Sequence, residues 1–533
     1  MARSKHLLGY FRIMDLIKGK ILWVDDEIEL LRSHILFLKE KGYLVTPVTN
    51  ADDAIALLHQ ESFDLVLLDE MMSGKGGLEA LVEIKEINPS LPVVMITKNE
   101  EESLMEDAIG SKIDDYLTKP VNPSQILLTC KKILERQKIT GDRFTKDYTQ
   151  EFHAIVTKMM DFLNWQDWLE VYQKLVGLEI ELEQHPDLGL GEVLFEQKRS
   201  CNIDFGRFFE ANYIQWVNGS SDAPVLSHQI VSKHIIPLIE GGKKIVFIII
   251  DNMRLDQWLA IESLLFPYFH IRKDYYYSIL PTATPYSRNA IFSGLFPSEV
   301  ESKYKDLWTN GSEDDFSRNR YERQLLDLQL KSKGLDLKPE PKYIKILDSQ
   351  EGKNLEKNLA SYLQSPLLSV VVNIVDIFAH NRSTSDILKE IVPDEAAFRS
   401  LTRSWFTHSF LFRVLRLLAQ EDVTVVMTSD HGSIRSMRGA KVIGDRETST
   451  NLRYKFGKNI KCDSKHAIMV KNPKDYKLPA RGVNVHYIIA REDYYFVYPT
   501  NYHKYLNYYK DSFQHGGVSM EEIILPVLKL DPK

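Results

Sequence analysis

Five side chains with phosphate and metal chemistry stand where apolar runs of the first 137 residues end. Asp25 and Asp26 follow ILWV, Asp69 ends LVLLD, and Thr97 and Lys119 come at the ends of two later runs. Because parallel strands end at one edge of a sheet, we expect these side chains to converge there. Three carboxylates repel each other, so the set favours a hard divalent cation such as Mg²⁺ and a nearby lysine. Asp69 could then attack a phosphoryl donor and form an aspartyl phosphate.

The segments that must position these residues alternate between two patterns over residues 20–137. The strand candidates are ILWVD, LVTPV, DLVLLD, PVVMIT and DDYLT, and amphipathic helical patterns lie between them. Five units of this kind predict a doubly wound parallel sheet. Residues 1–19 are expected to form an N-terminal tail, since regular patterning starts only after Met14.

This pattern resembles a response-regulator receiver domain with the CheY-like fold. The resemblance implies that Asp69 is the phosphoacceptor and that a sensor histidine kinase is the phosphodonor. It also assigns the other residues: Mg²⁺ binding to Asp25, Asp26, Asp69 and the backbone carbonyl of Met71, phosphate pairing to Lys119, a cis peptide before Pro120, and the switch pair to Thr97 and Tyr116. Two positions depart from the family pattern, because Ser73 stands where proline is usual and Lys98 where a small residue is usual.

A second set of metal-ligand side chains lies in the C-terminal half. Asp251 follows KIVFIII, Asp376 follows LSVVVNIV with His380 four residues on, Asp430 and His431 follow VTVVMTS, and His515 lies near the end. Three aspartates and three histidines make a mixed nitrogen and oxygen ligand set, which suits zinc better than Mg²⁺ or Ca²⁺. The near-continuous apolar runs before them are typical of a parallel sheet that is buried on both faces.

A nucleophile for this second site is expected in LPTATPYSRNAIFSG, residues 280–294. Proline is favoured at the first position of a helix, so Pro285 predicts that Thr284 is a helix N-cap. Its hydroxyl would then lie at the positive end of the helix dipole, where backbone N–H groups can hold phosphate oxygens. Thr282 lies two residues outside the helix and lacks that geometry. For Thr284 taken alone, a plain capping role is the alternative.

The order of these motifs resembles the alkaline-phosphatase superfamily, and specifically its PglZ branch. The resemblance implies an α/β domain with a pair of zinc ions. One zinc ion would be bound by Asp251, Thr284, Asp430 and His431, and the other by Asp376, His380 and His515. Two metal ions about 4 Å apart can activate an attacking oxygen and stabilise a leaving one. Arg288 and Arg382, each close to a ligand motif, are candidate phosphate clamps.

The remaining segments bear on organisation and substrate. Residues 138–228 have helical periodicity and no clear strand, which predicts a helical connector bundle between a receiver at 20–137 and the α/β domain at 229–533. Residues 435–481 carry 13 Lys or Arg against 4 Asp or Glu, and residues 476–509 carry nine tyrosines. Such side chains can hold a nucleic-acid backbone and stack its bases, which favours a phosphodiester substrate. Solvated lysines and core tyrosines are the plainer alternative.

The whole arrangement resembles the response regulators that control bacterial type IX protein secretion. The resemblance implies a zinc-dependent phosphodiesterase for cyclic or linear oligonucleotides and contact with secretion components or a sigma factor. It also implies a homodimer on phosphorylation, for which we expect the face formed by residues 99–137. Two alternatives stay open: a regulatory protein-binding module with a structural metal site, and a phosphomonoesterase.

Composition narrows the setting. Hydrophobic residues make up 44% and charged residues 26% of the chain, as in ordinary globular proteins. The apolar runs are too short to span a membrane, and no secretory signal pattern opens the chain. Cys130, Cys201 and Cys462 lie far apart, which argues against a disulfide framework and fits a reducing compartment. We therefore expect a cytoplasmic protein.

Overall fold

The computed structural model describes residues 18–98, 113–121, 123–134, 148–185, 190–308, 319–445, 449 and 451–533. The chain divides into two compact units, Met1–Gln150 and Glu151–Lys533, which are described separately below. Several predictions fall partly outside the described residues, namely the tail at 1–19, the dimerisation face at 99–137, the connector at 138–228 and the basic stretch at 435–481.

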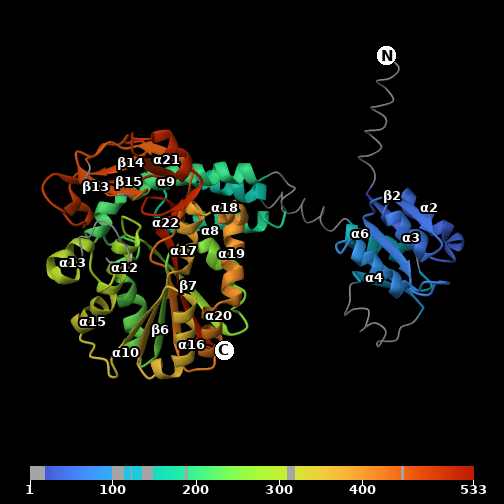
Figure 1. The fold of residues 1–533 in the computed structure, drawn as a ribbon, viewed down its shortest axis with the longest axis horizontal. Coiled ribbons are helices and arrows are strands. Elements are labelled where there is room, and N and C mark those ends of the chain that lie inside the picture. Colours follow the sequence, from blue (N-terminus) through green and yellow to red (C-terminus); the bar gives the residue numbers. More distant parts are fainter. Residues whose placement is uncertain are drawn as a thin grey trace, which may run out of the picture. The chain divides into compact units, whose positions relative to one another are not determined.

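The N-terminal unit is built on a parallel sheet with the strand order β2-β1-β3-β4-β5 (Figure 1). Its strands are β1 (Gly19–Val24), β2 (Tyr43–Val48), β3 (Leu65–Asp69), β4 (Val93–Thr97) and β5 (Asp115–Thr118), and its described helices include α2 (Arg32–Glu40), α3 (Ala51–Leu58), α4 (Gly77–Ile87) and α6 (Pro123–Leu134). Alternate β1 residues enter opposite cores, Ile21 and Trp23 one and Leu22 and Val24 the other. The predicted CheY-like doubly wound sheet is confirmed.

The second unit begins with helices that match the predicted connector. Helix α8 (Trp165–Leu182) starts at Asn164, whose side chain accepts hydrogen bonds from two backbone N–H groups of the first turn. Helix α9 (Gly191–Val217) packs against it, and the rings of Trp168 and Phe205 meet edge to face with centroids 5.4 Å apart. Among the described residues of this segment no strand occurs, as the sequence pattern predicted.

The main sheet of the second unit has the strand order β7-β18-β10-β6-β9-β8. Its strands are β6 (Ile245–Ile250), β7 (Phe269–Tyr277), β8 (Lys342–Ile346), β9 (Leu367–Val372), β10 (Thr424–Thr428) and β18 (Ile524–Pro532). Strands β10, β6, β9 and β8 run parallel, but β18 runs antiparallel to both of its neighbours, so the predicted parallel sheet is a mixed one. An antiparallel strand towards the edge of a doubly wound sheet is common, and an apolar run does not reveal its direction.

The segment between His431 and His515, which contains the basic stretch 435–481 and the tyrosine-rich stretch 476–509 and is called the insertion below, carries secondary structure of its own. It contains β11 (Ile434–Ser436), β12 (Arg438–Lys441), β13 (Tyr454–Lys458), β14 (Ala467–Val470), β15 (Val485–Ala490), β16 (Tyr494–Val497), α21 (Tyr502–Tyr509) and β17 (Ser512–Gln514). These strands form three small sheets, and α21 lies beside them (Figure 1). The ring of Tyr476 packs against Tyr213 of α9, with centroids 5.6 Å apart, so the insertion also contacts the connector.

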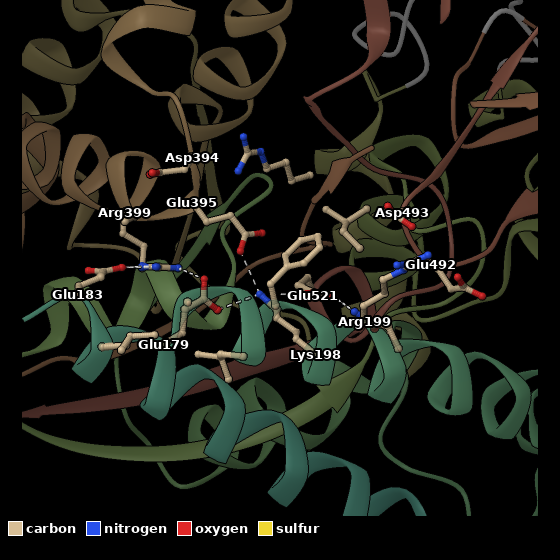
Figure 2. Close-up of a pocket in the computed structure, with 18 residues that line it drawn as sticks. Glu179, Glu183, Lys198, Arg199, Asp394, Glu395, Arg399, Glu492, Asp493 and Glu521 are labelled. Atoms are coloured by element: carbon tan, nitrogen blue, oxygen red, sulfur yellow. Dashed lines mark hydrogen bonds and ion pairs between the residues drawn. The ribbon is translucent and has the colours of Figure 1, made fainter. Parts of the chain in front are cut away.

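A buried ionic network joins the connector helices to the α/β domain (Figure 2). Its members are Glu179, Glu183, Lys198, Arg254, Asp256, Glu395, Arg399 and Glu521. The Lys198 ammonium of α9 lies 2.9 Å from Glu179, 3.1 Å from Glu395 of α19 (Glu395–His408) and 3.2 Å from Glu521. A cavity of about 400 Å³ lies beside the network. The connector is therefore held to the α/β domain by charges that are removed from water.

None of the described helices is long and apolar enough to cross a lipid bilayer. Cys130, Cys201 and Cys462 are all free thiols, as the spacing of the cysteines predicted.

Candidate metal centre and phosphorylation site

The N-terminal unit brings its three predicted acids together. Asp25 follows β1 and Asp69 ends the neighbouring β3, and with Asp26 they offer carboxylate oxygens that all lie within 4.8 Å of one another. The Lys119 ammonium, which follows β5, lies 3.0 Å from Asp25 Oδ2 and 2.9 Å from Asp69 Oδ1. The edge of the sheet thus holds three acids and one lysine.

Burial and pairing set the charges of this cluster. Burial raises the pKa of Asp69, and the hydrogen bond from Lys119 opposes that rise. Burial also acts to lower the pKa of Lys119, but its bonds to Asp69 and Asp25 outweigh burial and raise that pKa. Lys119 therefore stays cationic beside the aspartates, as a group that pairs with a phosphate must.

The other residues of the receiver prediction lie around this cluster. Thr97 ends β4 and Tyr116 lies in the adjacent β5, with 42% of its surface exposed. Met71 is exposed two residues after Asp69. The peptide before Pro120 is cis, which confirms that expectation.

Ser73, one of the two departures from the family pattern, has a specific contact. Its backbone N–H and its hydroxyl donate to Asp26 Oδ2 at 3.1 Å and 3.3 Å. A proline at this position has no N–H to donate, so the exchange adds a constraint on the orientation of Asp26. Lys98, the other departure, is exposed.

In the second unit, one ligand cluster joins Asp251, Asp430 and His431. Asp251 follows β6, and Asp430 and His431 follow the neighbouring strand β10, so their donor atoms lie within 4.8 Å of one another. The Thr284 hydroxyl oxygen lies 2.9 Å from His431 Nε2 and 3.4 Å from Asp251 Oδ1. All four residues expected at the first zinc position are together.

The other cluster joins Asp376, His380 and His515. Asp376 and His380 lie one turn apart on α17 (Ile374–Thr384), so they project from the same face of that helix. His380 Nε2 lies 3.4 Å from Asp376 Oδ1 and 3.2 Å from His515 Nε2. The His380 side chain is 48% exposed, so this cluster opens to solvent.

The two clusters adjoin each other. The rings of His431 and His515 stack with centroids 4.2 Å apart. Between the clusters, the Asn252 side-chain amide donates to Asp376 Oδ1 at 3.1 Å, and its backbone N–H lies 3.4 Å from Asp430 Oδ1. Asn252 has φ of 63°, a left-handed conformation that asparagine tolerates better than most residues. Sequence reasoning missed this residue, although an asparagine directly after a strand-end aspartate is a usable signal.

The start of the Thr284 helix differs from the prediction by one residue. Helix α12 (Thr284–Ser293) begins at Thr284, its N-cap is Ala283, and Pro285 is the second helical residue. No side chain caps the helix, so the prediction that Thr284 is the N-cap is wrong. Proline also fits the second position of a helix, where its missing N–H is not needed. Freed from capping, the Thr284 hydroxyl faces the ligand cluster.

Burial sets the charges of both clusters. It lowers the pKa of His431 and of His515, so these imidazoles are neutral, which is the form that binds metal. Burial raises the pKa of Asp376 to about 6 and, together with Asp251, raises that of Asp430 well above its ordinary value. Burial also acts to raise the pKa of Asp251, but Arg288 outweighs it and the pKa is lowered. A site with this excess of buried carboxylates favours a bound cation.

The spacing of donor atoms fits metal ligation. A tetrahedral zinc ion holds its nitrogen and oxygen ligands roughly 3.3 to 3.6 Å apart, given its bond lengths. Seven donor pairs in the two clusters are 2.9 to 3.8 Å apart, and all the donors of each three-residue cluster lie within 4.8 Å of one another. Asp430 Oδ2 is also buried without a hydrogen-bond donor among the described residues, as an oxygen reserved for a metal ion is.

The two candidate phosphate clamps have other partners. Arg288 is buried, and its guanidinium donates to Asp251 Oδ2 and to Glu322 Oε1, each at 2.6 Å. Arg382 is also buried and donates to backbone oxygens of Val392, Pro393 and Asp511. Both arginines thus hold protein groups in place, and this geometry does not favour the clamp role predicted for them.

The basic and aromatic insertion divides into buried and exposed parts. Arg453 pairs with Glu522 in the interior, and Arg438 pairs with Glu492 and Asp493. Tyr487 and Tyr495 are core residues. Among the described residues of the insertion, the exposed cations are eight lysines: Lys441, Lys458, Lys461, Lys465, Lys471, Lys474, Lys504 and Lys510. Tyr505 and Tyr508 of α21 are 38% and 43% exposed. Only part of the predicted nucleic-acid surface therefore faces solvent.

A receiver fold joined to an alkaline-phosphatase-like fold defines a two-component response regulator with a phosphatase-like output domain. Residues 21–131 match the response regulator receiver domain, residues 138–217 the PorX response regulator linker domain, and residues 230–530 the BREX system PglZ alkaline phosphatase-like domain. The last match covers more than half of the chain, so the chain belongs to the PglZ family. The three matches follow the order of a PorX-like response regulator with a PglZ domain.

Curated relatives match the receiver segment. The transcriptional regulatory protein ResD of Bacillus subtilis is 36% identical over 122 residues, which are 23% of this chain and 50% of ResD. The alginate biosynthesis transcriptional regulatory protein AlgB of Pseudomonas aeruginosa is 36% identical over 124 residues, 23% of this chain and 28% of AlgB. The chain thus spans half or less of the length of these relatives. Receiver domains of this class imply a histidine kinase as the phosphodonor.

Solved structures match the same segment. A CheY-like receiver domain protein from Methanospirillum hungatei is 29% identical, covering 23% of this chain and 97% of its own, with a TM-score of 0.22. The NtrX receiver domain from Brucella abortus is 32% identical, covering 22% of this chain and 98% of its own, with a TM-score of 0.21.

Proposed function

We propose that the chain is a response regulator, phosphorylated on Asp69, whose output domain is a zinc-dependent phosphodiesterase for cyclic or linear oligonucleotides. We assign the receiver to residues 20–137, the connector to 138–228 and the catalytic domain to 229–533. The match to the PorX linker supports a role in controlling type IX protein secretion, through secretion components or a sigma factor as partners.

One observation carries the catalytic part of the proposal. The Thr284 hydroxyl lies among Asp251, Asp430 and His431, and a second ligand cluster adjoins this one through stacked histidine rings. A hydroxyl that served only to cap a helix would face backbone N–H groups instead. The arrangement matches what a threonine nucleophile with two metal ions requires.

The chemistry follows from what these side chains do. The Thr284 oxygen attacks phosphorus as its proton is lost, the bond to the leaving alkoxide breaks, and the alkoxide takes up a proton to become the alcohol. Water then cleaves the resulting phosphodiester of Thr284, which releases a phosphomonoester and regenerates the hydroxyl. In the first turn of α12, Pro285 has no N–H, and those of Tyr286 and Ser287 donate to the Ala283 carbonyl, so the Thr284 N–H is the candidate donor to a phosphate oxygen. Asp251 and His431 hold the attacking oxygen through contacts of 3.4 Å and 2.9 Å, and both side chains are buried. Bound zinc supplies Lewis-acid stabilisation of the charge that develops on the oxygens.

A diester substrate is favoured by the exposed lysines of the insertion and by Tyr505 and Tyr508, which offer charge for a backbone and rings for bases. The openness of the His380 side supports an enzyme over the alternative, a regulatory binding module whose metal is structural. Structural zinc sites are closed by four protein ligands, whereas catalytic ones keep an open position.

Metal removal and restoration test this proposal. We expect the chelated protein to be inactive on bis-p-nitrophenyl phosphate and on short oligonucleotides, and we expect zinc to restore turnover. Hydrolysis of the diester should exceed that of p-nitrophenyl phosphate at equal concentration. A faster monoester reaction would identify a phosphomonoesterase, and zinc binding without turnover on any of these substrates would favour the regulatory binding module.

Phosphorylation of the receiver gives a separate prediction. Acetyl phosphate should add one phosphoryl group to the intact protein and shift it toward a dimer, because the aspartyl phosphate adds charge at one sheet edge. Intact-mass spectrometry and light scattering measure the two effects. Asp69→Asn should abolish both, while the control Asp64→Asn, a receiver carboxylate outside the cluster of Asp25, Asp26 and Asp69, should keep them. An unchanged molar mass of the phosphorylated wild type would contradict the dimer.

A further inference from the structure

Glu322 is a fully buried carboxylate that is linked through Arg288 to Asp251 of the first ligand cluster. It has no role in the proposed reaction. It is the first residue of α15 (Glu322–Ser332). Its Oε1 accepts from Arg288 Nε at 2.6 Å and from Asn319 Nδ2 at 2.7 Å, and its Oε2 accepts from the Tyr343 hydroxyl. A buried carboxylate with three donors is held in one orientation.

Arg288 connects this carboxylate to a metal ligand. It lies one helical turn after Thr284 on α12, and its Nη1 donates to Asp251 Oδ2 at 2.6 Å. The Asn373 amide donates to the same oxygen at 2.7 Å. With Oδ2 occupied by two donors, Asp251 presents Oδ1 to Thr284 and His431, at 3.4 Å and 3.6 Å. Arg288 thus decides which oxygen of Asp251 faces the cluster.

The positive charge of Arg288 must be compensated in this buried position. A buried guanidinium beside a metal site repels a divalent cation, and the effect is large where water is excluded. Glu322 offsets that charge, so the metal site does not adjoin an uncompensated guanidinium. Arg288 Nη1 also lies 3.7 Å from Asp430 Oδ2, so the same guanidinium contacts both carboxylates of the cluster.

The same carboxylate is tied to the helix of the nucleophile. Asn319 donates to Glu322 and also to the backbone oxygen of Thr284, at 3.2 Å. A shift of Glu322 would therefore change the position of the Asp251 carboxylate, through Arg288, and of the first turn of α12, through Asn319.

We infer that Glu322 is a positioning residue of the metal centre. It holds Arg288 in the position from which Arg288 orients Asp251, and it neutralises the charge of the Arg288 guanidinium. The inference rests on the proposed zinc site. Groups that orient metal ligands from outside typically alter metal affinity or activity by 10- to 100-fold when removed.

The test compares Glu322→Gln with the wild type in zinc affinity, measured by competition with a chromophoric chelator. Glutamine keeps the size of the side chain but leaves Arg288 uncompensated, so we expect zinc affinity to fall about 10- to 100-fold. At saturating zinc, kcat should fall while KM stays within about twofold, because Glu322 touches no substrate. Glu322→Asp, which keeps the charge, should recover part of the affinity.

Asp327→Asn is the matched control, since it removes a carboxylate from the same helix outside the cluster and should leave zinc affinity unchanged. If Glu322→Gln does not fold, Tyr343→Phe is the second variant, because it removes only the hydroxyl that donates to Glu322. We expect its zinc affinity to be about threefold or more below that of the wild type. Zinc affinity equal to the wild type in the folded variants would overturn the inference. A wild type that binds no zinc would instead refute the proposed function itself.

Discussion

Thr284→Val should lower kcat for diester hydrolysis by at least about 1,000-fold, since loss of a nucleophile removes the step on which the others depend. Valine has nearly the shape of threonine, and position 284 is a buried helical residue without a capping role. Folding should therefore be little affected, and the loss can be assigned to the missing hydroxyl. Steady-state rates with bis-p-nitrophenyl phosphate at saturating zinc measure it.

Thr284→Ser is the matched control, because it keeps an oxygen beside His431 Nε2 and should retain part of the activity. Zinc content should be measured for both variants, since Thr284 is also an expected ligand. A Thr284→Val protein that loads zinc and still hydrolyses diesters within about tenfold of the wild type would exclude threonine as the nucleophile.

Lys198→Met should destabilise the second unit by about 3–5 kcal/mol, the range found when one partner of a buried ion pair is removed. The ammonium lies within 3.2 Å of three carboxylates, and its side chain is 12% exposed. Without it, Glu179, Glu395 and Glu521 face one another in the interior. Urea unfolding followed by tryptophan fluorescence measures the loss.

Lys174→Met provides the comparison on the neighbouring helix, α8. Its ammonium pairs with Glu151 at 2.8 Å but is 35% exposed, so its removal should cost less than about 1 kcal/mol. Equal losses in the two variants would contradict the view that the network is desolvated.

The loss in free energy of unfolding caused by Lys198→Met should become smaller at low pH. Burial already raises the pKa of Glu179 in the native protein, and Lys198 opposes that rise. Without the lysine the folded-state pKa lies higher still. A folded-state pKa above the unfolded one favours the folded protein at low pH, and that advantage is lost as pH rises through the folded-state pKa. The variant should therefore gain stability relative to the wild type as pH falls from 7 toward 5.

The receiver and the metal ligands could be predicted because local pattern determines them. Asp25 and Asp69 follow apolar runs of strand length, and the ends of parallel strands meet whatever the details of the loops. His380 is four residues after Asp376, and this spacing places both on one helix face. The predicted start of α12 is one residue too late, because proline is tolerated at more than one position of the first turn of a helix.

The residues that orient the ligands could not be predicted in the same way. Glu322 and Arg288 are 34 residues apart, and Asn373 and Asp251 are 122 apart, so no local pattern links them. The same limit applies to the partners of Arg288, because proximity to a motif does not reveal whether an arginine is buried. The antiparallel direction of β18 was likewise invisible, since an apolar run reads the same both ways.

The buried ionic network has a consequence for how such proteins exchange modules during evolution (Figure 2). Joining the PglZ domain to a different regulator at residue 230 would take Lys198 away from Glu395 and Glu521. It would also take the connector acids Glu179 and Glu183 away from Arg399. A recombination event that preserves folding must carry α8 and α9 together with the catalytic domain. The connector and the catalytic domain should therefore be exchanged between proteins as one unit, whereas the receiver lies outside this ionic network.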